Sequence, residues 1–140
     1  MPYGLLYLTE PKILSMKLSP HQLDHMVLAQ FGWEAVELVE SKNFARLAER
    51  FGYALAFGRN IEAAIEADFH RCLLEASESS SKPTKSVQVK YFGPNKITLY
   101  AVIECVIPVN PNTAVLVELI VTGVDVKYIT LEDISCISWR

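Results

Sequence analysis

The sequence has few cysteines, no excess of basic residues and no long uninterrupted hydrophobic segment. Its three cysteines, Cys72, Cys105 and Cys136, lack the spacing of a disulfide framework or a metal site, so we expect reduced thiols in the core. Lysine and arginine number 13 against 16 aspartates and glutamates, which excludes a strongly basic nucleic-acid binder. The longest apolar runs are interrupted by Glu104 and Glu118 before they reach the ~18 residues of a membrane helix.

Motifs that carry chemistry are also missing. The six glycines are scattered, so there is no glycine-rich phosphate loop, and no Gly-x-Ser-x-Gly nucleophile motif occurs. Residues 1–10 lack the basic start of a signal peptide, and we therefore expect a cytoplasmic protein that makes no membrane contact. We also expect no cofactor, no catalytic residue and no direct contact with nucleic acid.

The composition that is present suits one folded domain. The chain has 140 residues, of which 51% are hydrophobic and 21% are charged, enough for a single core without disulfides. Residues 1–76 are expected to be mainly helical, residues 77–86 to be a polar, serine-rich loop, and residues 87–140 to be mainly strands. We predict one domain over residues 1–140.

The helical half opens with the segment Ser19-Pro20-His21-Gln22, a typical helix start. A serine can cap the helix, a proline fits its first position, and a glutamine at the third position completes a capping box. We expect Gly32 to end this helix. Residues 33–40 favour a short helix, although the same residues could alternate as a strand.

Two more helices follow in this half. Apolar residues recur at three- and four-residue steps over residues 44–55, with Asn43 as the expected cap and Gly52 inside the helix, where another backbone would pack closely. Gly58 is a plausible stop, and Asn60 can cap a second apolar stripe over residues 61–76.

The C-terminal half is rich in β-branched residues and predicts four to five strands. Short connections favour antiparallel neighbours, so we expect an α+β fold in which three to four helices pack on one face of an antiparallel sheet. Pro108 to Asn112 is expected to be a loop. The strands are expected over residues 87–92, 96–107, 113–121, 124–129 and 134–139.

The two faces of this sheet are expected to differ. One face is wholly apolar and must lie under the helices. The other mixes apolar side chains with Glu104, Glu118, Tyr100 and Thr98, which suits a partly solvated surface. It could be covered by the N-terminal segment, by a second copy or by a partner protein, or it could stay exposed while residues 5–8 add a strand.

Histidine and aspartate residues offer two further candidate sites. His21 and His25 would share one helix face, but no third metal ligand accompanies them, so we predict surface histidines and no metal site. Asp68 and His70 lie near a buried helical stripe, where a carboxylate with a perturbed pKa could act in catalysis. The helical spacing of Asp68 and Arg71 predicts charge pairing instead.

Negative charge is concentrated in the helical half. Residues 1–80 hold 7 basic and 11 acidic residues, a net charge of −4, whereas residues 81–140 hold 6 and 5, a net charge of +1. Such a field favours a basic protein partner. We predict that the partner contacts carboxylates of this half, namely Glu34, Glu37, Glu40, Glu62, Glu66 and Asp68.

The segment over residues 44–68 reads FARLAERFGYALAFGRNIEAAIEAD. It resembles the central helices of bacterial immunity proteins of contact-dependent growth inhibition systems, and the similarity extends over residues 33–76. The resemblance implies a small cytosolic α+β protein that binds and blocks a toxic C-terminal domain delivered by a neighbouring cell. We therefore expect a non-catalytic inhibitor that neutralises a basic cognate toxin domain by stoichiometric occlusion.

Two other functions remain open at this stage. The partly apolar outer sheet face and Asp68 would also suit a small homodimeric ligand-binding or enzymatic domain, with a pocket lined by Asp68, His70, Tyr53 or Tyr100. An exposed sheet edge would suit a structural or assembly subunit that pairs with another chain.

Overall fold

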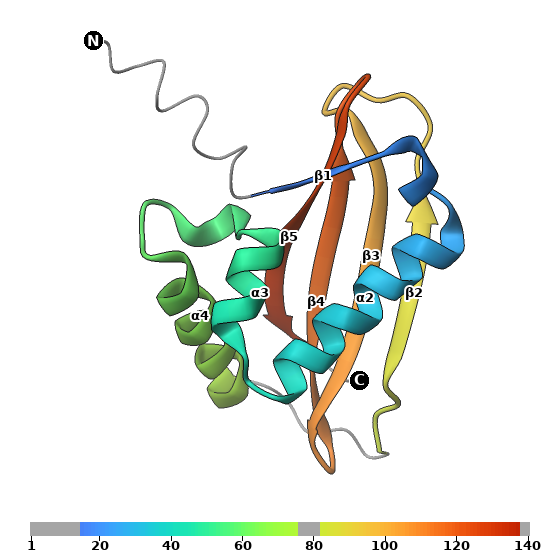
Figure 1. Cartoon of the computed structure of the whole chain (residues 1–140). Coiled ribbons are helices and arrows are strands. Elements are labelled where there is room, and N and C mark those ends of the chain that lie inside the picture. The colour runs from blue at the N-terminus through green and yellow to red at the C-terminus, as the bar shows by residue number, and fades with distance from the viewer. Residues whose placement is uncertain (1–14, 76–81, 138–140) are drawn as a thin grey trace, which may run out of the picture.

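A layer of helices covers one face of an antiparallel sheet in the computed structural model, which describes residues 15–75 and 82–137 (Figure 1). These residues form three α-helices, α2 (His25–Glu40), α3 (Phe44–Phe51) and α4 (Ile61–Glu75), and two 3-10 turns, η1 (Pro20–Gln22) and η2 (Ala54–Ala56). They also form five strands, β1 (Met16–Leu18), β2 (Ser86–Tyr91), β3 (Leu99–Asn110), β4 (Thr113–Thr122) and β5 (Lys127–Cys136). The predicted α+β fold is confirmed.

The sheet has the order β1-β5-β4-β3-β2, and all neighbouring strands are antiparallel. The short strand β1 pairs with β5 through Met16 and Ile129, and Ser15 Oγ lies 2.6 Å from Thr130 Oγ1. The sequence did not predict β1, because three residues are too few to show alternation. The strand that residues 5–8 were considered able to add lies outside the described residues.

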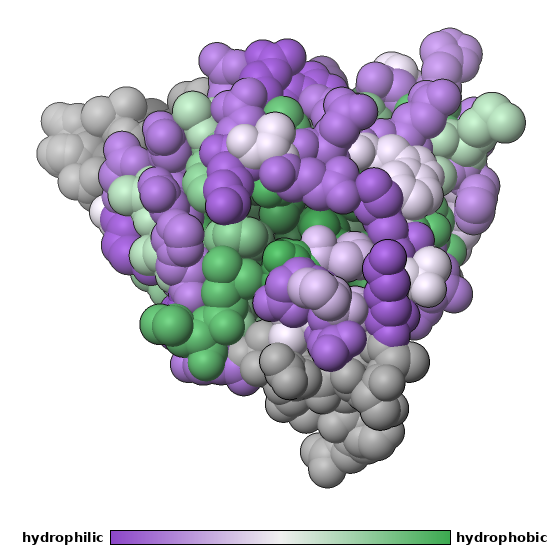
Figure 2. All heavy atoms as spheres, turned by 90° about the horizontal axis from the view of Figure 1, so that it is seen from below, coloured by the Kyte–Doolittle hydropathy of each residue, from purple (hydrophilic) through white to green (hydrophobic). Residues whose placement is uncertain are grey.

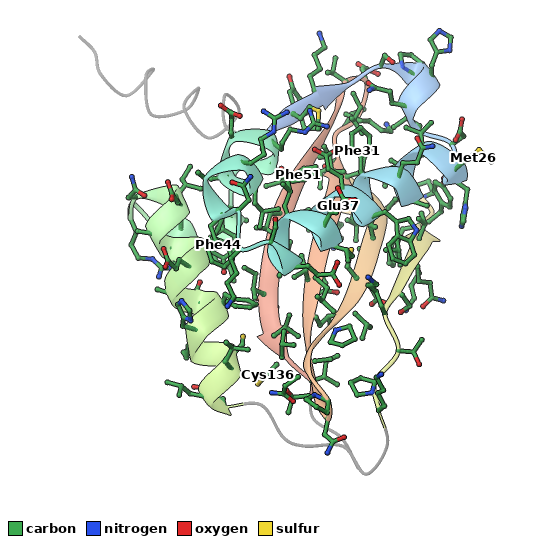
Figure 3. All side chains as sticks on the ribbon, turned by 60° about the horizontal axis from the view of Figure 1, so that its bottom comes forward. Met26, Phe31, Glu37, Phe44, Phe51 and Cys136 are labelled. Carbon is green, nitrogen blue, oxygen red and sulfur yellow. The ribbon has the colours of Figure 1, made fainter. Side chains whose placement is uncertain are left out.

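The core lies between the helices and the inner face of the sheet. Alternate residues of β3 and β4 are fully buried, and they join the helical stripes in one continuous hydrophobic cluster. Phe31 and Phe51 meet there edge to face, with ring centroids 6.3 Å apart. Figure 3 shows both rings, and that of Phe44, between the helices and the sheet. None of the helices in the described part of the chain is long and apolar enough to span a membrane.

Helix α2 runs through Gly32, so the prediction that Gly32 ends the helix is wrong, and residues 33–40 are the second half of α2. Asp24 caps α2 by accepting the Val27 amide at 2.9 Å, while the predicted start at Ser19 forms only η1. A glycine is needed inside α2 because the helix lies very close to the sheet. A Cβ atom on Gly32 would lie 2.5 Å from Val87 Cγ1 and 2.8 Å from Ile103 Cγ2.

Replacing Gly32 with alanine is expected to lower the free energy of unfolding by about 1–2 kcal/mol. Overpacking costs about 1–3 kcal/mol, and two contacts below 3 Å with stiff β-branched side chains put this site at about 2–3 kcal/mol, of which the gain in helix propensity offsets about 1 kcal/mol. Urea denaturation measures the change. Gly93→Ala is the matched control, since a Cβ atom there has nothing within 4 Å and should leave stability nearly unchanged. Equal midpoints for both variants would contradict the close packing.

Helix α3 ends at Phe51 with Gly52 as its C-terminal cap, so the helix expected over residues 44–55 is shorter than predicted. Gly52 has φ +65°, a left-handed conformation that favours glycine, and its amide donates to the Ala48 carbonyl at 2.8 Å. The two predicted asparagine caps are confirmed. Asn43 Oδ1 accepts the Arg46 amide, and Asn60 Oδ1 accepts the Ala63 amide.

Three strand boundaries differ clearly from those predicted. Strand β3 begins at Leu99 and not at residue 96, so Thr98, which was expected on the outer face, precedes the strand at φ +53°. Pro108 lies inside β3 rather than in a loop, opposite Ala114, and the missing amide falls next to a register shift between Pro108 and Asn110. Strand β5 is one strand from Lys127, because the turn after β4 extends through Val126. The final residues of the chain expected as a strand, 138 and 139, lie outside the described part.

Candidate functional site

The six carboxylates expected to bind a partner have different surroundings. Glu34 accepts two hydrogen bonds from the Arg50 guanidinium, one of them at 2.8 Å, and this pair raises the pKa of Arg50. Glu40 pairs with Lys85 at 2.9 Å. These two carboxylates are therefore already neutralised by cations of the chain itself.

Three of the other four carboxylates are exposed to solvent. Glu37 and Glu62 are exposed on different helices and have no ion-pair partner among the described residues. Glu66, also exposed, lies 3.7 Å from His70 Nε2, the spacing that helical geometry predicts. These carboxylates contribute to the field around α2 and α4.

Asp68 is the sixth, and it is buried with only 3% of its surface exposed. Its carboxylate accepts hydrogen bonds from Tyr53 Oη at 2.5 Å, from Arg71 Nη1 at 2.8 Å and from both terminal nitrogens of Arg59. Arg59 also donates to the carbonyls of Leu55 and Ala56. This Asp68 network therefore fastens η2 to α4.

The charges around Asp68 determine its protonation. Burial acts to raise the pKa of Asp68, but hydrogen bonds from Arg59, Tyr53 and Arg71 outweigh it and lower that pKa below its usual value. The pKa of Tyr53 is raised, first by burial and then by its bond to Asp68. Asp68 is thus held ionised, which suits a structural anchor more than a proton donor.

The cysteines also have core surroundings. Burial raises the pKa of Cys72 to about 11 and that of Cys105 to about 12, so both thiols are protonated at neutral pH. Cys72 Sγ donates to the Ile134 carbonyl and Cys105 Sγ to the Gly32 carbonyl. Within the described residues, no three His, Cys, Asp or Glu side chains are placed to hold a metal ion.

Two of the hollows formed by the described residues lie at opposite ends of the sheet. The first, about 430 Å³, lies between the β2–β3 and β4–β5 connections and is lined by Phe92, Tyr100 and Lys127 among others. The second, about 380 Å³, lies where α2 ends beside α4 and β3. Figure 2 shows this end, with hydrophobic residues on the floor of a hollow and hydrophilic residues around it. Tyr100 lines the first hollow, whereas Asp68 and Tyr53 line neither of the two. The residues considered for a single pocket therefore do not share one of these hollows.

The face of the sheet opposite the helices, here called the open face, has an ordered pattern. All three described α-helices pack on the other face (Figure 1), and residues of β3 and β4 on the open face are only partly buried. Register partners align in rows across the strands. One row is Lys90, Val102, Ile120 and Thr130, and another is Ser86, Val106, Leu116 and Ser135.

Between these two rows lies a row of carboxylates. Glu104 on β3 is the register partner of Glu118 on β4, and Glu118 is the partner of Asp133 on β5. A register shift after Glu118 inserts Glu132 as an extra residue in β5, a β-bulge that adds a fourth carboxylate. We call Glu104, Glu118, Glu132 and Asp133 the acidic row.

The carboxylates of the acidic row repel one another in the folded protein. The pKa of Glu118 is raised, first by desolvation and then by the charges of Glu104, Asp133 and Glu132, while Lys90 acts in the opposite direction. Lys90 Nζ pairs with Glu104 at 3.1 Å, whereas no described residue forms an ion pair or hydrogen bond with the Glu118 side chain. Like charges directly opposite each other destabilise a sheet.

Replacing Glu118 with glutamine is expected to raise the free energy of unfolding at pH 7 by about 0.2–1 kcal/mol, the size of a cross-strand pair. Because the pKa of Glu118 is raised on folding, the folded state binds a proton more tightly than the unfolded state. The destabilisation is therefore present at neutral pH and disappears as the pH falls through the folded pKa to the usual value near 4.5.

Urea denaturation at pH 7 and at about pH 4 checks this change in stability. The exposed Glu62→Gln variant is the control and should alter stability less at both pH values. A Glu118→Gln variant that is less stable than the parent at pH 7 would contradict the repulsion.

Sequence reasoning found only part of this site. Alternation placed Glu104 and Glu118 on the outer face. It did not place Glu132 and Asp133, because they fall between the strands expected over residues 124–129 and 134–139, where a bulge breaks the two-residue period of β5. Comparison of the chain with protein-family models, curated proteins and solved structures finds no match.

Proposed function

We propose that this protein is a non-catalytic inhibitor of the immunity type, which binds a basic toxin domain and neutralises it by stoichiometric occlusion. The observation that carries the proposal is that many cations of the chain are paired with carboxylates of the same chain. All four arginines in the described residues, Arg46, Arg50, Arg59 and Arg71, form ion pairs with carboxylates of the same chain.

The charge left to a partner is negative on balance, because the described residues hold 14 carboxylates against 11 lysines and arginines, although five of these lysines form no ion pair among them. Lys85 and Lys90 are also paired internally, with Glu40 and Glu104. Carboxylates on α2, on α4 and in the acidic row remain without such partners in the described structure. A surface of this kind attracts a basic protein and speeds its association, particularly at low ionic strength.

The resemblance of residues 33–76 to immunity proteins supplies the class of partner. Toxin domains that act on nucleic acid carry basic clefts, and an acidic protein can block such a cleft by covering it without any chemistry of its own. Asp68 and the buried thiols of Cys72 and Cys105 suit this proposal, since each is engaged within the fold.

The test is protection of growing cells. The toxic C-terminal domain of a large secreted protein encoded beside this chain should arrest growth when it is expressed alone. Co-expression of this chain should restore growth, and the two purified proteins should form a complex of fixed stoichiometry. Restoration of growth without a complex, or a complex that leaves the toxin active, would contradict occlusion.

A further inference from the structure

We infer that the open face of the sheet is the docking surface of this protein, and that the partner inserts at least one arginine or lysine side chain between aliphatic side chains there. The inference takes from the proposed function only that the partner is a basic protein. It names the surface and the chemistry of the contact, which the proposed function leaves open.

The apolar rows make this face suitable for burial. Val102 pairs with Ile120 on one side of the acidic row, and Val106 pairs with Leu116 on the other. All four side chains are only partly buried within the described residues. An aliphatic partner surface would remove them from water, which is the main favourable term in protein association.

The acidic row determines what kind of partner fits. Docking would desolvate Glu118, which lies at the centre of the face and has no ion-pair partner among the described residues. An unpaired carboxylate is costly to bury, whereas a carboxylate that receives a guanidinium or ammonium group is not left uncompensated. Arginine suits the position best, because its planar group can bond two carboxylates at once.

A second copy of the chain fits this surface poorly. Stacking two open faces would bring the acidic row of one copy against that of the other, with Lys90 and Lys17 only on the edge strands. Like charges brought together in a contact oppose association. The same row that attracts a basic partner therefore disfavours a dimer through this face.

The exposed carboxylates on the helices are the alternative docking surface, but their surroundings differ from those of the acidic row. Glu37, Glu62 and Glu66 are exposed side chains on helices, so solvent screens them strongly. The acidic row lies among apolar side chains, where a partner that excludes water strengthens each ion pair. We therefore expect the acidic row to govern the lifetime of a complex and the helical carboxylates to influence mainly its rate of formation.

The test selects ligands from a random peptide library displayed on phage, using the purified chain as bait. The expected peptides alternate arginine or lysine with aliphatic residues. Their affinity, measured by calorimetry with a synthetic peptide, should fall about tenfold or more in the triple variant Glu104→Gln, Glu118→Gln, Asp133→Asn. The control is the triple variant Glu37→Gln, Glu62→Gln, Glu66→Gln, which removes the same number of charges from the helices.

Two results would overturn the inference. Selected peptides could lack basic residues, or the control variant could weaken binding as much as the variant of the acidic row. Amide chemical-shift changes on titrating the peptide into the unmodified chain give a second readout, which does not depend on any variant folding. These changes should map to β3, β4 and β5, and a map confined to α2 and α4 would also overturn the inference.

The inference and the proposed function can fail separately. If the chain protects cells against the toxin and the acidic-row variant protects equally well, the docking surface is wrong and the inhibitor function stands. If the chain binds basic peptides through the open face but protects against no toxin, the inhibitor function is wrong. If the unmodified chain forms a dimer that dissociates when residues of the acidic row are replaced by lysine, the open face binds a second copy of the chain and the inference is wrong.

Discussion

Replacing Phe51 with alanine is expected to lower the free energy of unfolding by about 3–5 kcal/mol, the range for a large aromatic side chain lost from a core. Phe51 is fully buried, and its ring meets Phe31 edge to face while the Arg50 guanidinium lies 5.8 Å from the ring centroid. The cavity would form where α2, α3 and the sheet meet, so the surrounding side chains can relax only in part.

Urea denaturation should show a lower midpoint with an unchanged slope. The total stability of a domain is about 5–15 kcal/mol, so the loss removes a large fraction of it at the lower end of that range. Phe57→Ala is the matched control, because Phe57 lies six residues further on and is 80% exposed. A loss for Phe51→Ala as small as that expected for Phe57→Ala would contradict the core position of Phe51.

Replacing Asp68 with asparagine is expected to lower the free energy of unfolding at pH 7 by about 2–3 kcal/mol. Removing one partner of a buried ion pair costs about 3–5 kcal/mol, but Arg59 and Arg71 are 42% and 54% exposed, and water can solvate them in the variant. The loss should be local at first, because the Asp68 network fastens η2 to α4.

The pH dependence of this effect has a definite sign. The pKa of Asp68 is lowered on folding, so its contribution is fully present above the usual value near 3.8 and is lost as the pH falls through the folded pKa. The difference between the parent and Asp68→Asn should therefore close only in strong acid. Denaturation at several pH values measures it, with the exposed Glu66→Gln as control. A difference that grows as the pH falls would contradict the network.

The sequence predicted the elements of this fold better than their ends. Periodicity identified the helices, but it predicted a helix end at Gly32, because a glycine at such a position is typical of a terminus. The close approach of the helix to the sheet, which requires this glycine, is visible only in three dimensions. Gly52 was misread in the opposite sense, because its left-handed conformation is decided by the path of the chain after α3.

The candidate site was predictable only where it follows local rules. Alternation gave the outer positions of Glu104 and Glu118, and charge counting gave an acidic helical half. The ion pairs of Glu34 with Arg50 and of Glu40 with Lys85 join residues 16 and 45 positions apart, so no local pattern reveals that these carboxylates are already neutralised. The bulge that adds Glu132 is likewise set by pairing with β4.

The pairing of β1 with β5 has a consequence for the order of folding. Ser15 and Thr130, which are in contact, lie 115 positions apart in sequence. Closing so long a loop is slow, and during synthesis β1 and all three helices of the described chain are made before β3, β4 and β5. The apolar faces of α2, α3 and α4 would then remain exposed to water until the strands of the sheet are made. We therefore expect native structure to appear only when synthesis has passed β5, with the attachment of β1 among the last steps.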